Sequence, residues 1–341
     1  MNTYTFLTPP GQGAIGVIQV QGISASECVD QIFVSLRGIL VSEVSCDRVL
    51  YGKILKEDVV VCRTGEDVVE IHSHGSPVAM RRIAQLLEVH GVKELSYEKF
   101  LERHYTNKIQ RIAAEMLPHA TTWRISSIIM DQYNGALRDA LLEIDMEQVP
   151  ERRQNLKEKL FCWQHIAKHL LVPWKIIFAG PTNVGKSSLF NALLGFSRVL
   201  VDDRAGTTRD LVKENFTFDG WNFLLVDTAG WREGTEDEIE KGGMRRAEEE
   251  MADADLILMV HDARDFPHFV EGFTFPPEKK CLHVWNKCDL CQSSPLINEK
   301  ENSVFVSAKW EESMPVLCEK ILKILIPVTP KPGTAIPIGL V

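Results

Sequence analysis

Residues 180–188 read GPTNVGKSS, which matches the pattern G-x-x-x-x-G-K-[ST]. An apolar, partly β-branched run precedes this stretch (WKIIFA, 174–179), and a run with helical spacing follows it (SSLFNALLG, 187–195), ending at a glycine suited to a helix C-cap. In such a strand, glycine-rich loop and helix, backbone amides converge on phosphate oxygens at the helix N-terminus. The stretch therefore predicts a phosphate-binding loop (P-loop) whose nucleotide contacts are Asn183, Val184, Gly185, Lys186, Ser187 and Ser188.

Two side chains of this P-loop have distinct predicted roles. Lys186 would bridge the outer phosphates, and the hydroxyl of Ser187 would be a ligand of Mg²⁺. For the motif alone, a glycine turn that binds nothing is the alternative interpretation. The sequence that follows the motif weighs against that alternative.

From residue 172 onward, strand-like apolar runs alternate with helical patterns, which is typical of a doubly wound α/β sheet. Two of the runs are joined by Asp219-Gly220, a hairpin turn signal. Sheets of this kind bind ligands where their parallel strands end. The predicted strands are 216–220, 221–227, 255–262, 281–285 and 303–307, and the predicted helices are 236–254 and 316–325.

Two short motifs near strand ends predict contacts to the metal and to the γ-phosphate. The motif DTAG begins at Asp227, which would hold Mg²⁺ through water, and ends at Gly230, whose amide would meet the γ-phosphate. The motif AGTTRD lies in the loop after the P-loop helix. One of its threonines, Thr208 in preference to Thr207, would complete the Mg²⁺ shell when a triphosphate is bound.

The motif NKCD at 286–289 predicts which base is bound. Asn286 supplies an amide, Lys287 an alkyl stem, and Asp289 a carboxylate that can accept hydrogen bonds from the N1 and N2 hydrogens of guanine. Adenine offers no such pair of donors, so the carboxylate selects guanine.

The motif SAK provides a backbone N–H near the guanine oxygen, with Ser307 and Ala308 as the contact residues. Each short motif alone is common by chance, but five in this order, each at its expected element, predict a GTP site that uses Mg²⁺.

Composition and charge narrow the class of protein. The 341 residues are 45% hydrophobic and carry a formal net charge of −9, which argues against a surface coated in nucleic acid but leaves room for a local basic patch. No apolar run approaches the roughly 20 residues that span a bilayer, and the N-terminus does not resemble a signal peptide. The eight scattered cysteines are expected to be reduced, and the Cys288-x-x-Cys291 pair lacks a second pair at zinc-site spacing. We expect a cytoplasmic protein without a membrane partner.

The string GTTRD, followed by DTAGWRE and DEIEKGGMRRA, resembles the MnmE (TrmE) family of tRNA-modification GTPases. TPPGQGAIGVIQVQG (8–22) and RTGEDVVEIHSHGSP (63–77) resemble the start of that family. The resemblance implies a multidomain α/β protein with a small α+β domain first and a P-loop GTPase domain with a doubly wound mixed sheet later. The implied parts are a folate-binding and dimerisation domain (1–118), a shortened helical segment (119–171), a TrmE-type G domain (172–328) and an irregular tail (329–341).

The resemblance also implies how GTP would be hydrolysed. Trp231 stands directly after D-x-x-G, where many regulatory GTPases carry a glutamine that orients water, and an indole cannot accept a proton. The family implies that Glu240 takes this catalytic part beside Lys186, whereas an exposed helix carboxylate is the alternative. It implies that K⁺, held by Asn183 and carbonyls of 202–206, offsets the developing charge between the phosphates. A turn-stabilising side chain is the alternative for Asn183.

The N-terminal resemblance comes with losses. The family binds a one-carbon tetrahydrofolate here, but Gln19 stands where the family has an arginine in R-x-S-G. The segment 96–112 keeps only part of its motif, and an amphipathic helix start with solvated charges is favoured over folate binding there. The retained residues of that segment are Phe100, Arg103, Asn107 and Lys108, and the other polar candidates are Glu66, Glu70 and His74.

Two helical stretches are predicted in the middle of the chain, 122–146 and 151–171, broken at Pro150. The family's helical domain is longer and ends in C-[IVL]-G-K, whereas this sequence ends in the Pro/Gly-rich run TPKPGTAIPIGLV, so the resemblance is to a C-terminally shortened member.

Two functions stay open. One is modification of C5 of the tRNA wobble uridine, for which the resemblance implies three partners: a second copy of the chain, tRNA and the FAD-dependent protein MnmG. The other is a GTP-dependent regulatory switch, RNA- or ribosome-associated or a diverged paralogue, without modification chemistry.

Overall fold

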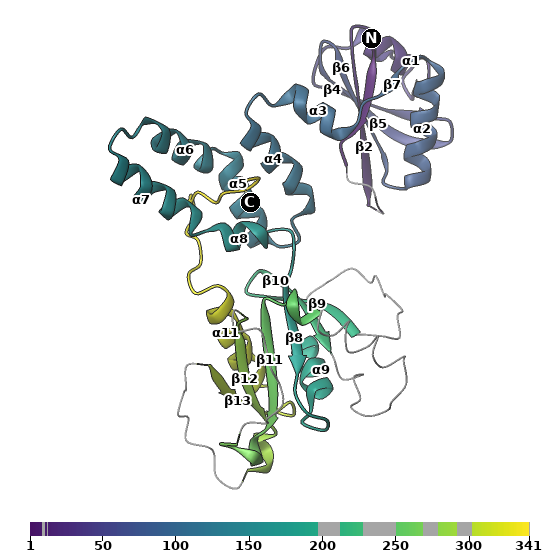
Figure 1. Ribbon diagram of the computed structural model, residues 1–341. Helices are drawn as coiled ribbons and strands as arrows, with labels where there is room; N and C mark the ends of the chain where they lie inside the picture. The colour runs from purple at the N-terminus through teal and green to yellow at the C-terminus, as the bar shows by residue number, and fades with distance from the viewer. Residues whose placement is uncertain are drawn as a thin grey trace, which may run out of the picture. The chain divides into compact units, whose positions relative to one another are not determined.

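The computed structural model describes residues 1–8, 11, 13–196, 212–227, 250–268, 279–291 and 302–340. The chain forms two compact units, Met1–His119 and Ala120–Val341 (Figure 1). Each unit contains its own β-sheet. The multidomain α/β fold predicted from the sequence is confirmed.

The first unit is built on a mixed sheet with the strand order β3-β4-β5-β6-β2-β1-β7. Neighbouring strands are antiparallel except β1 and β7, which are parallel. The strands are β1 (Thr3–Phe6), β2 (Ile15–Gln21), β3 (Phe33–Ser35), β4 (Arg48–Ile54), β5 (Glu57–Gly65), β6 (Val68–His74) and β7 (Lys93–Glu94). The helices are α1 (Ala25–Asp30), α2 (Pro77–Val89), α3 (Tyr97–His104) and α4 (Lys108–Met116), with 3-10 turns at Val41–Glu43 and Leu117–His119.

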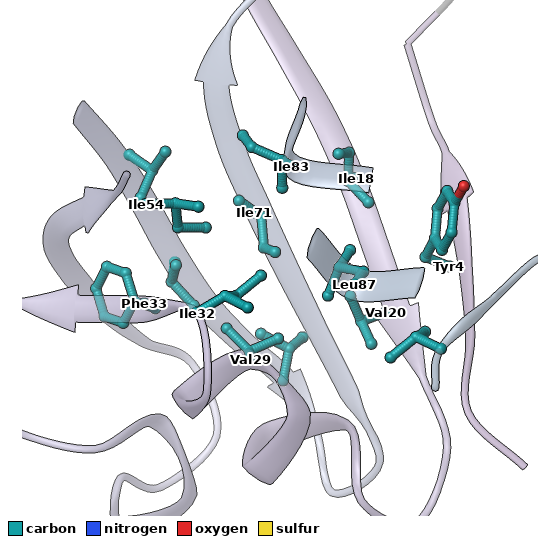
Figure 2. Packing of buried hydrophobic residues seen from close by; sticks show 14 of the residues in the cluster. Tyr4, Ile18, Val20, Val29, Ile32, Phe33, Ile54, Ile71, Ile83 and Leu87 are labelled. Atoms are coloured by element: carbon teal, nitrogen blue, oxygen red, sulfur yellow. The ribbon is translucent and has the colours of Figure 1, made fainter. Parts of the chain in front are cut away.

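The core of this unit lies between one face of the sheet and its helices. Ile18 and Val20 of β2, Ile71 of β6, and Ile83 and Leu87 of α2 gather there, each at most 1% exposed (Figure 2). Ile18 and Val20 reach the core together, because a strand turns every second side chain to the same face.

The second unit begins with short helices, in the region where the sequence predicts two longer helices over 122–146 and 151–171. They are α5 (Trp123–Tyr133), α6 (Ala136–Met146), α7 (Pro150–Phe161) and α8 (Gln164–Lys168). The stretch 122–146 is divided at Gly135, whose φ of 114° is incompatible with a continuous α-helix. Pro150 is the first residue of α7, where its missing N–H removes no helical hydrogen bond.

The sheet of the second unit has the order β13-β12-β11-β8-β10-β9. Its strands run parallel except β9, which pairs antiparallel with β10. The strands are β8 (Trp174–Ala179), β9 (Val212–Phe218), β10 (Trp221–Asp227), β11 (Leu256–Asp262), β12 (Cys281–Asn286) and β13 (Ser303–Phe305). The helices are α9 (Lys186–Phe196) and α11 (Ser313–Leu325), with 3-10 turns at Ala263–Asp265 and Cys288–Leu290.

The predicted hairpin is confirmed, since Asp219 and Gly220 both have positive φ, 48° and 74°, as a two-residue turn of this hand requires. Several predicted boundaries are corrected. Helix α9 passes through Gly195 instead of ending there, and α11 begins at Ser313 instead of residue 316. The helix predicted over 236–254 lies outside the described residues except for its last few positions.

The hairpin turn is fixed to the start of α5. Arg124 donates from Nε to the Asp219 carbonyl at 2.6 Å and from Nη2 to the Asp219 carboxylate at 2.8 Å. Thr122 donates its hydroxyl to the Gly220 carbonyl at 2.7 Å. The Arg124 guanidinium also lies 5.9 Å from the ring centre of the buried Trp221. Helix α5 and the hairpin therefore form one packed assembly.

The tail contains no helix or strand among its described residues, and it packs against α5. Ile336 and Ile338 are 0% and 2% exposed. The buried Gln132 accepts from the Ile336 amide at 3.0 Å and donates to the Thr334 carbonyl at 3.0 Å, while Asp131 accepts from the Gly333 amide at 2.8 Å. These hydrogen bonds satisfy backbone groups that no helix or strand pairs. Within the described part of the chain, no helix has both the length and the apolar character needed to cross a membrane.

Candidate nucleotide-binding site

The P-loop joins β8 to α9 and is folded tightly by its glycines. Gly180 and Gly185 have φ of 132° and 93°, and Asn183 has φ of 64°. A Cβ on Gly180 would lie 2.3 Å from the Val260 carbonyl oxygen. A Cβ on Gly185 would lie 2.4 Å from the amide nitrogen of Asn286. Only glycine fits both positions, which explains why the pattern requires it there.

Lys186 lies across this loop at the first turn of α9. Its Nζ donates to the carbonyls of Gly180 at 2.8 Å and Pro181 at 2.7 Å. Burial lowers the pKa of Lys186, and the carboxylate of Asp227 at the end of β10 opposes that shift. The ammonium is thus held against the P-loop backbone, while Ser187 and Ser188 are exposed.

Asn286 connects the P-loop to the SAK segment. Its amide nitrogen donates to the Val184 carbonyl at 2.9 Å, and its amide oxygen accepts from the Ala308 N–H at 3.1 Å. The residue is 1% exposed. The structure therefore gives Asn286 a bracing role between the phosphate end and the base end of the site.

Lys287 forms a second brace that sequence reasoning missed. It has a positive φ of 67°, and its Nζ donates to the Asn183 carbonyl and, at 2.9 Å, to the Asp262 carboxylate. Arg264 contacts both oxygens of Asp262, at 2.9 and 2.7 Å, and this pairing holds the pKa of Asp262 well below its usual range. The sequence signal for this brace was the carboxylate of Asp262, which ends the apolar run 255–262.

Asp289 is positioned at the base end of the site. It accepts from the Ser307 hydroxyl at 2.7 Å and pairs with Lys309 Nζ at 3.1 Å. The Ser307 hydrogen bond is the main cause that lowers the pKa of Asp289, so the carboxylate is an ionised acceptor. Ser307 itself is fully buried and bonded through its N–H to the Ser313 hydroxyl.

The described candidates thus meet at the carboxyl edge of the sheet. The motifs that converge there are the P-loop, Asp227 at the end of β10, NKCD and SAK, as the rule for doubly wound sheets predicts. The remaining candidates lie outside the described residues: Thr207, Thr208, Gly230, Glu240 and the potassium loop 202–206. Cys288, within NKCD, is buried and donates to the Trp285 carbonyl at 3.4 Å, and burial raises its pKa to about 11.

The N-terminal candidates are only partly brought together. Gln19 donates to the Glu70 carboxylate at 3.3 Å, and Glu70 also lies 3.3 Å from His72. Arg103 lines a separate hollow of about 460 Å³ beside Gln21 of β2. Asn107 caps α4 by accepting from the amides of Ile109 and Gln110. The retained Asn107 therefore has a structural role.

A P-loop at a strand end, together with an aspartate and a SAK loop suited to guanine, defines the second unit as a P-loop GTPase. A family model described as 50S ribosome-binding GTPase matches residues 175–287. A model described as GTP-binding protein TrmE N-terminus matches residues 2–108.

Curated relatives extend the match to both units. The tRNA modification GTPase MnmE of Chlamydia trachomatis serovar L2 is 32% identical over 93% of this chain and 79% of its own length. That of Clostridioides difficile (strain 630) is 30% identical over 92% of this chain and 79% of its own. Among solved structures, Era in complex with MgGDPNP and a 16S ribosomal RNA fragment is similar at 27% identity, with a TM-score of 0.34 over 46% of this chain and 58% of that chain. The chain belongs to the MnmE family of tRNA modification GTPases.

Proposed function

We propose that this chain hydrolyses GTP, with Mg²⁺, in order to modify C5 of the wobble uridine of tRNA, acting as a homodimer with the FAD-dependent protein MnmG. The observation that supports it most is the convergence of the P-loop, Asn286, Asp289 and Ser307 at one edge of the sheet, in a chain that resembles the MnmE relatives across both units. Glu240 would orient the attacking water, and Thr208 and Gly230 would meet the metal and the γ-phosphate.

A second candidate is a GTP-dependent switch without modification chemistry. It is favoured by Gln19, which stands at the family's arginine position and donates to Glu70. A neutral amide paired with a carboxylate offers no fixed positive charge to an anionic folate. The first candidate requires the N-terminal unit to bind tetrahydrofolate without that charge.

Nucleoside mass spectrometry of bulk tRNA separates the two candidates. The gene would be expressed, with the MnmG of the same source, in a host that lacks its own MnmE. We expect the C5-modified wobble uridine to return, and the Lys186→Ala variant to leave it absent. A folded wild-type chain that hydrolyses GTP but restores no modified nucleoside would favour the switch.

Potassium dependence is the finer part of the proposal, and it concerns Asn183. This residue is exposed at a positive φ, and its carbonyl is held by Lys287, so its side chain stands at the rim of the P-loop. We expect GTP hydrolysis in K⁺ to exceed that in Na⁺ by about tenfold, which corresponds to about 1.4 kcal/mol of barrier.

The Asn183→Ala variant should lose most of this preference while still binding GDP. Exposed Thr182→Ala, one position earlier, serves as a matched control and should keep it. Equal rates in the two salts, measured as phosphate release, would exclude potassium from the mechanism.

A further inference from the structure

A basic hollow lies at the opposite edge of the second unit's sheet from the nucleotide site. It has a volume of about 510 Å³ and is formed by the start of β12 and the last turns of α11. Four lysines line it: Lys279, Lys280, Lys320 and Lys323. The whole chain carries a formal net charge of −9, so this gathering of positive charge runs against the average of the molecule.

None of the four lysines forms a direct ion pair with a carboxylate among the residues that the structure describes, although Lys279 lies near enough to Asp255 to contribute to the lowered pKa of that carboxyl. Lys279 donates to the Ala254 carbonyl at 3.0 Å, and Lys280 donates to the Ile324 carbonyl at 2.9 Å. A carbonyl is neutral, so neither of these two hydrogen bonds offsets the positive charge of an ammonium group. Lys320 and Lys323 have neither a hydrogen bond nor an ion pair to any described side chain.

Stabilisation of a helix end accounts for only part of this arrangement. The C-terminus of a helix attracts cations, and Lys280 and Lys323 lie at that end of α11. Lys320 lies almost a turn earlier, and Lys279 caps a different segment. Four like charges lining one hollow repel one another, and an external anion relieves that repulsion.

The side chains indicate which anion fits. An ammonium is a point charge on a flexible stem and is well suited to phosphate, whereas carboxylates are preferentially matched by the planar fork of arginine. Among the described residues that line the hollow there is no arginine and no aromatic ring except His283, and burial lowers the pKa of His283, which disfavours its charged form. Such a surface contacts a backbone without reading bases.

We propose that this basic hollow binds the phosphate backbone of RNA. The assignment rests on the proposed function, which provides tRNA as the polyanion. It is compatible with GTP binding, because Cys281 beside the hollow and Asn286 at the nucleotide site are five residues apart on one strand, roughly 17 Å. RNA and GTP can therefore be bound at the same time.

The test uses the full chain with GTP and Mg²⁺ and a fluorescent, unmodified tRNA transcript with a wobble uridine. Binding is followed by anisotropy from about 50 to about 200 mM salt. The Lys320→Gln/Lys323→Gln variant leaves the two carbonyl-bonded lysines in place. We expect its affinity to fall roughly tenfold at low salt, and the slope of log K against log salt to fall by about 2, one per lost phosphate contact.

Two matched variants separate the effect of where the lysines lie from the effect of how much charge is removed. Lys157→Gln/Lys159→Gln removes the same charge from the exposed side of α7 and should keep the affinity within about twofold. Lys320→Arg/Lys323→Arg keeps the charge in the hollow and should bind as the wild type does. GTP hydrolysis in the absence of RNA should be unchanged in all three variants.

Each contrary result has a separate meaning. Equal binding by the wild type and Lys320→Gln/Lys323→Gln would overturn the assignment and leave the proposed function standing. A wild type that hydrolyses GTP but binds no transcript would count against both. Displacement of the transcript by polyglutamate at equal charge concentration would show that the hollow binds polyanions in general, which would overturn its assignment to RNA.

Discussion

Replacing Lys186 by alanine is expected to lower GTP turnover by about 10²–10³-fold, the usual effect of removing one preorganised charge from a developing oxyanion. In the structure the ammonium is held by the carbonyls of Gly180 and Pro181. Phosphate oxygens would replace those neutral acceptors with charged ones, which bind an ammonium more strongly. Phosphate release at saturating GTP measures the change in turnover.

The same substitution leaves two P-loop carbonyls without a donor, so nucleotide binding must be measured separately. Titration with a fluorescent GDP analogue gives that affinity, and Lys157→Ala on α7 serves as a control of equal charge. A Lys186→Ala variant that retains the wild-type rate would remove this lysine from the mechanism. A loss confined to affinity would make the residue a binding group only.

Replacing Asp289 by asparagine is expected to change the preferred base. The ionised carboxylate would accept two hydrogen bonds from guanine, and hydrogen bonds to charged groups are worth about 1.5–3 kcal/mol each. Losing the charge and one of these hydrogen bonds should weaken GTP binding by at least roughly 10–10²-fold. An amide instead offers a donor to the 2-oxo group of xanthine, so affinity for XTP should rise as that for GTP falls.

Lys309→Gln is the matched control for this specificity change. It removes the 3.1 Å ion pair with Asp289 but leaves the carboxylate and its 2.7 Å hydrogen bond from Ser307. The pair is largely exposed on the lysine side, so GTP affinity should change by no more than about threefold. Competition of GTP against XTP in both variants decides the matter. An Asp289→Asn variant with unchanged preference would show that another group reads the base.

Local signals made the P-loop and the hairpin predictable. Gly180, Gly185 and the Asp219-Gly220 turn have positive φ, a conformation that favours these residue types. Such a preference can be recognised from a few adjacent residues of the sequence. The convergence of the described motifs followed from the rule that parallel sheets bind ligands at their carboxyl edge. The fold class and the convergence of these motifs were therefore accessible from the sequence.

Contacts between distant residues were not predictable in this way. The pairing of Lys287 with Asp262 and the bridge from Asn286 to Val184 join positions 25 and 102 residues apart. Gln132 and Ile336 are 204 residues apart. A Pro/Gly-rich run with two isoleucines carries too short a pattern to show that it packs against a helix.

Helix α5 forms a strut about 16 Å long: the hairpin turn is hydrogen-bonded near its first residues and the tail near its last. The two hairpin strands begin just after GTTRD and end at the first residue of DTAG, so the hairpin turn links both motifs along the chain to the strut. Thermodynamic reciprocity then applies in both directions. A ligand whose affinity GTP changes through this strut must change the affinity for GTP by the same factor.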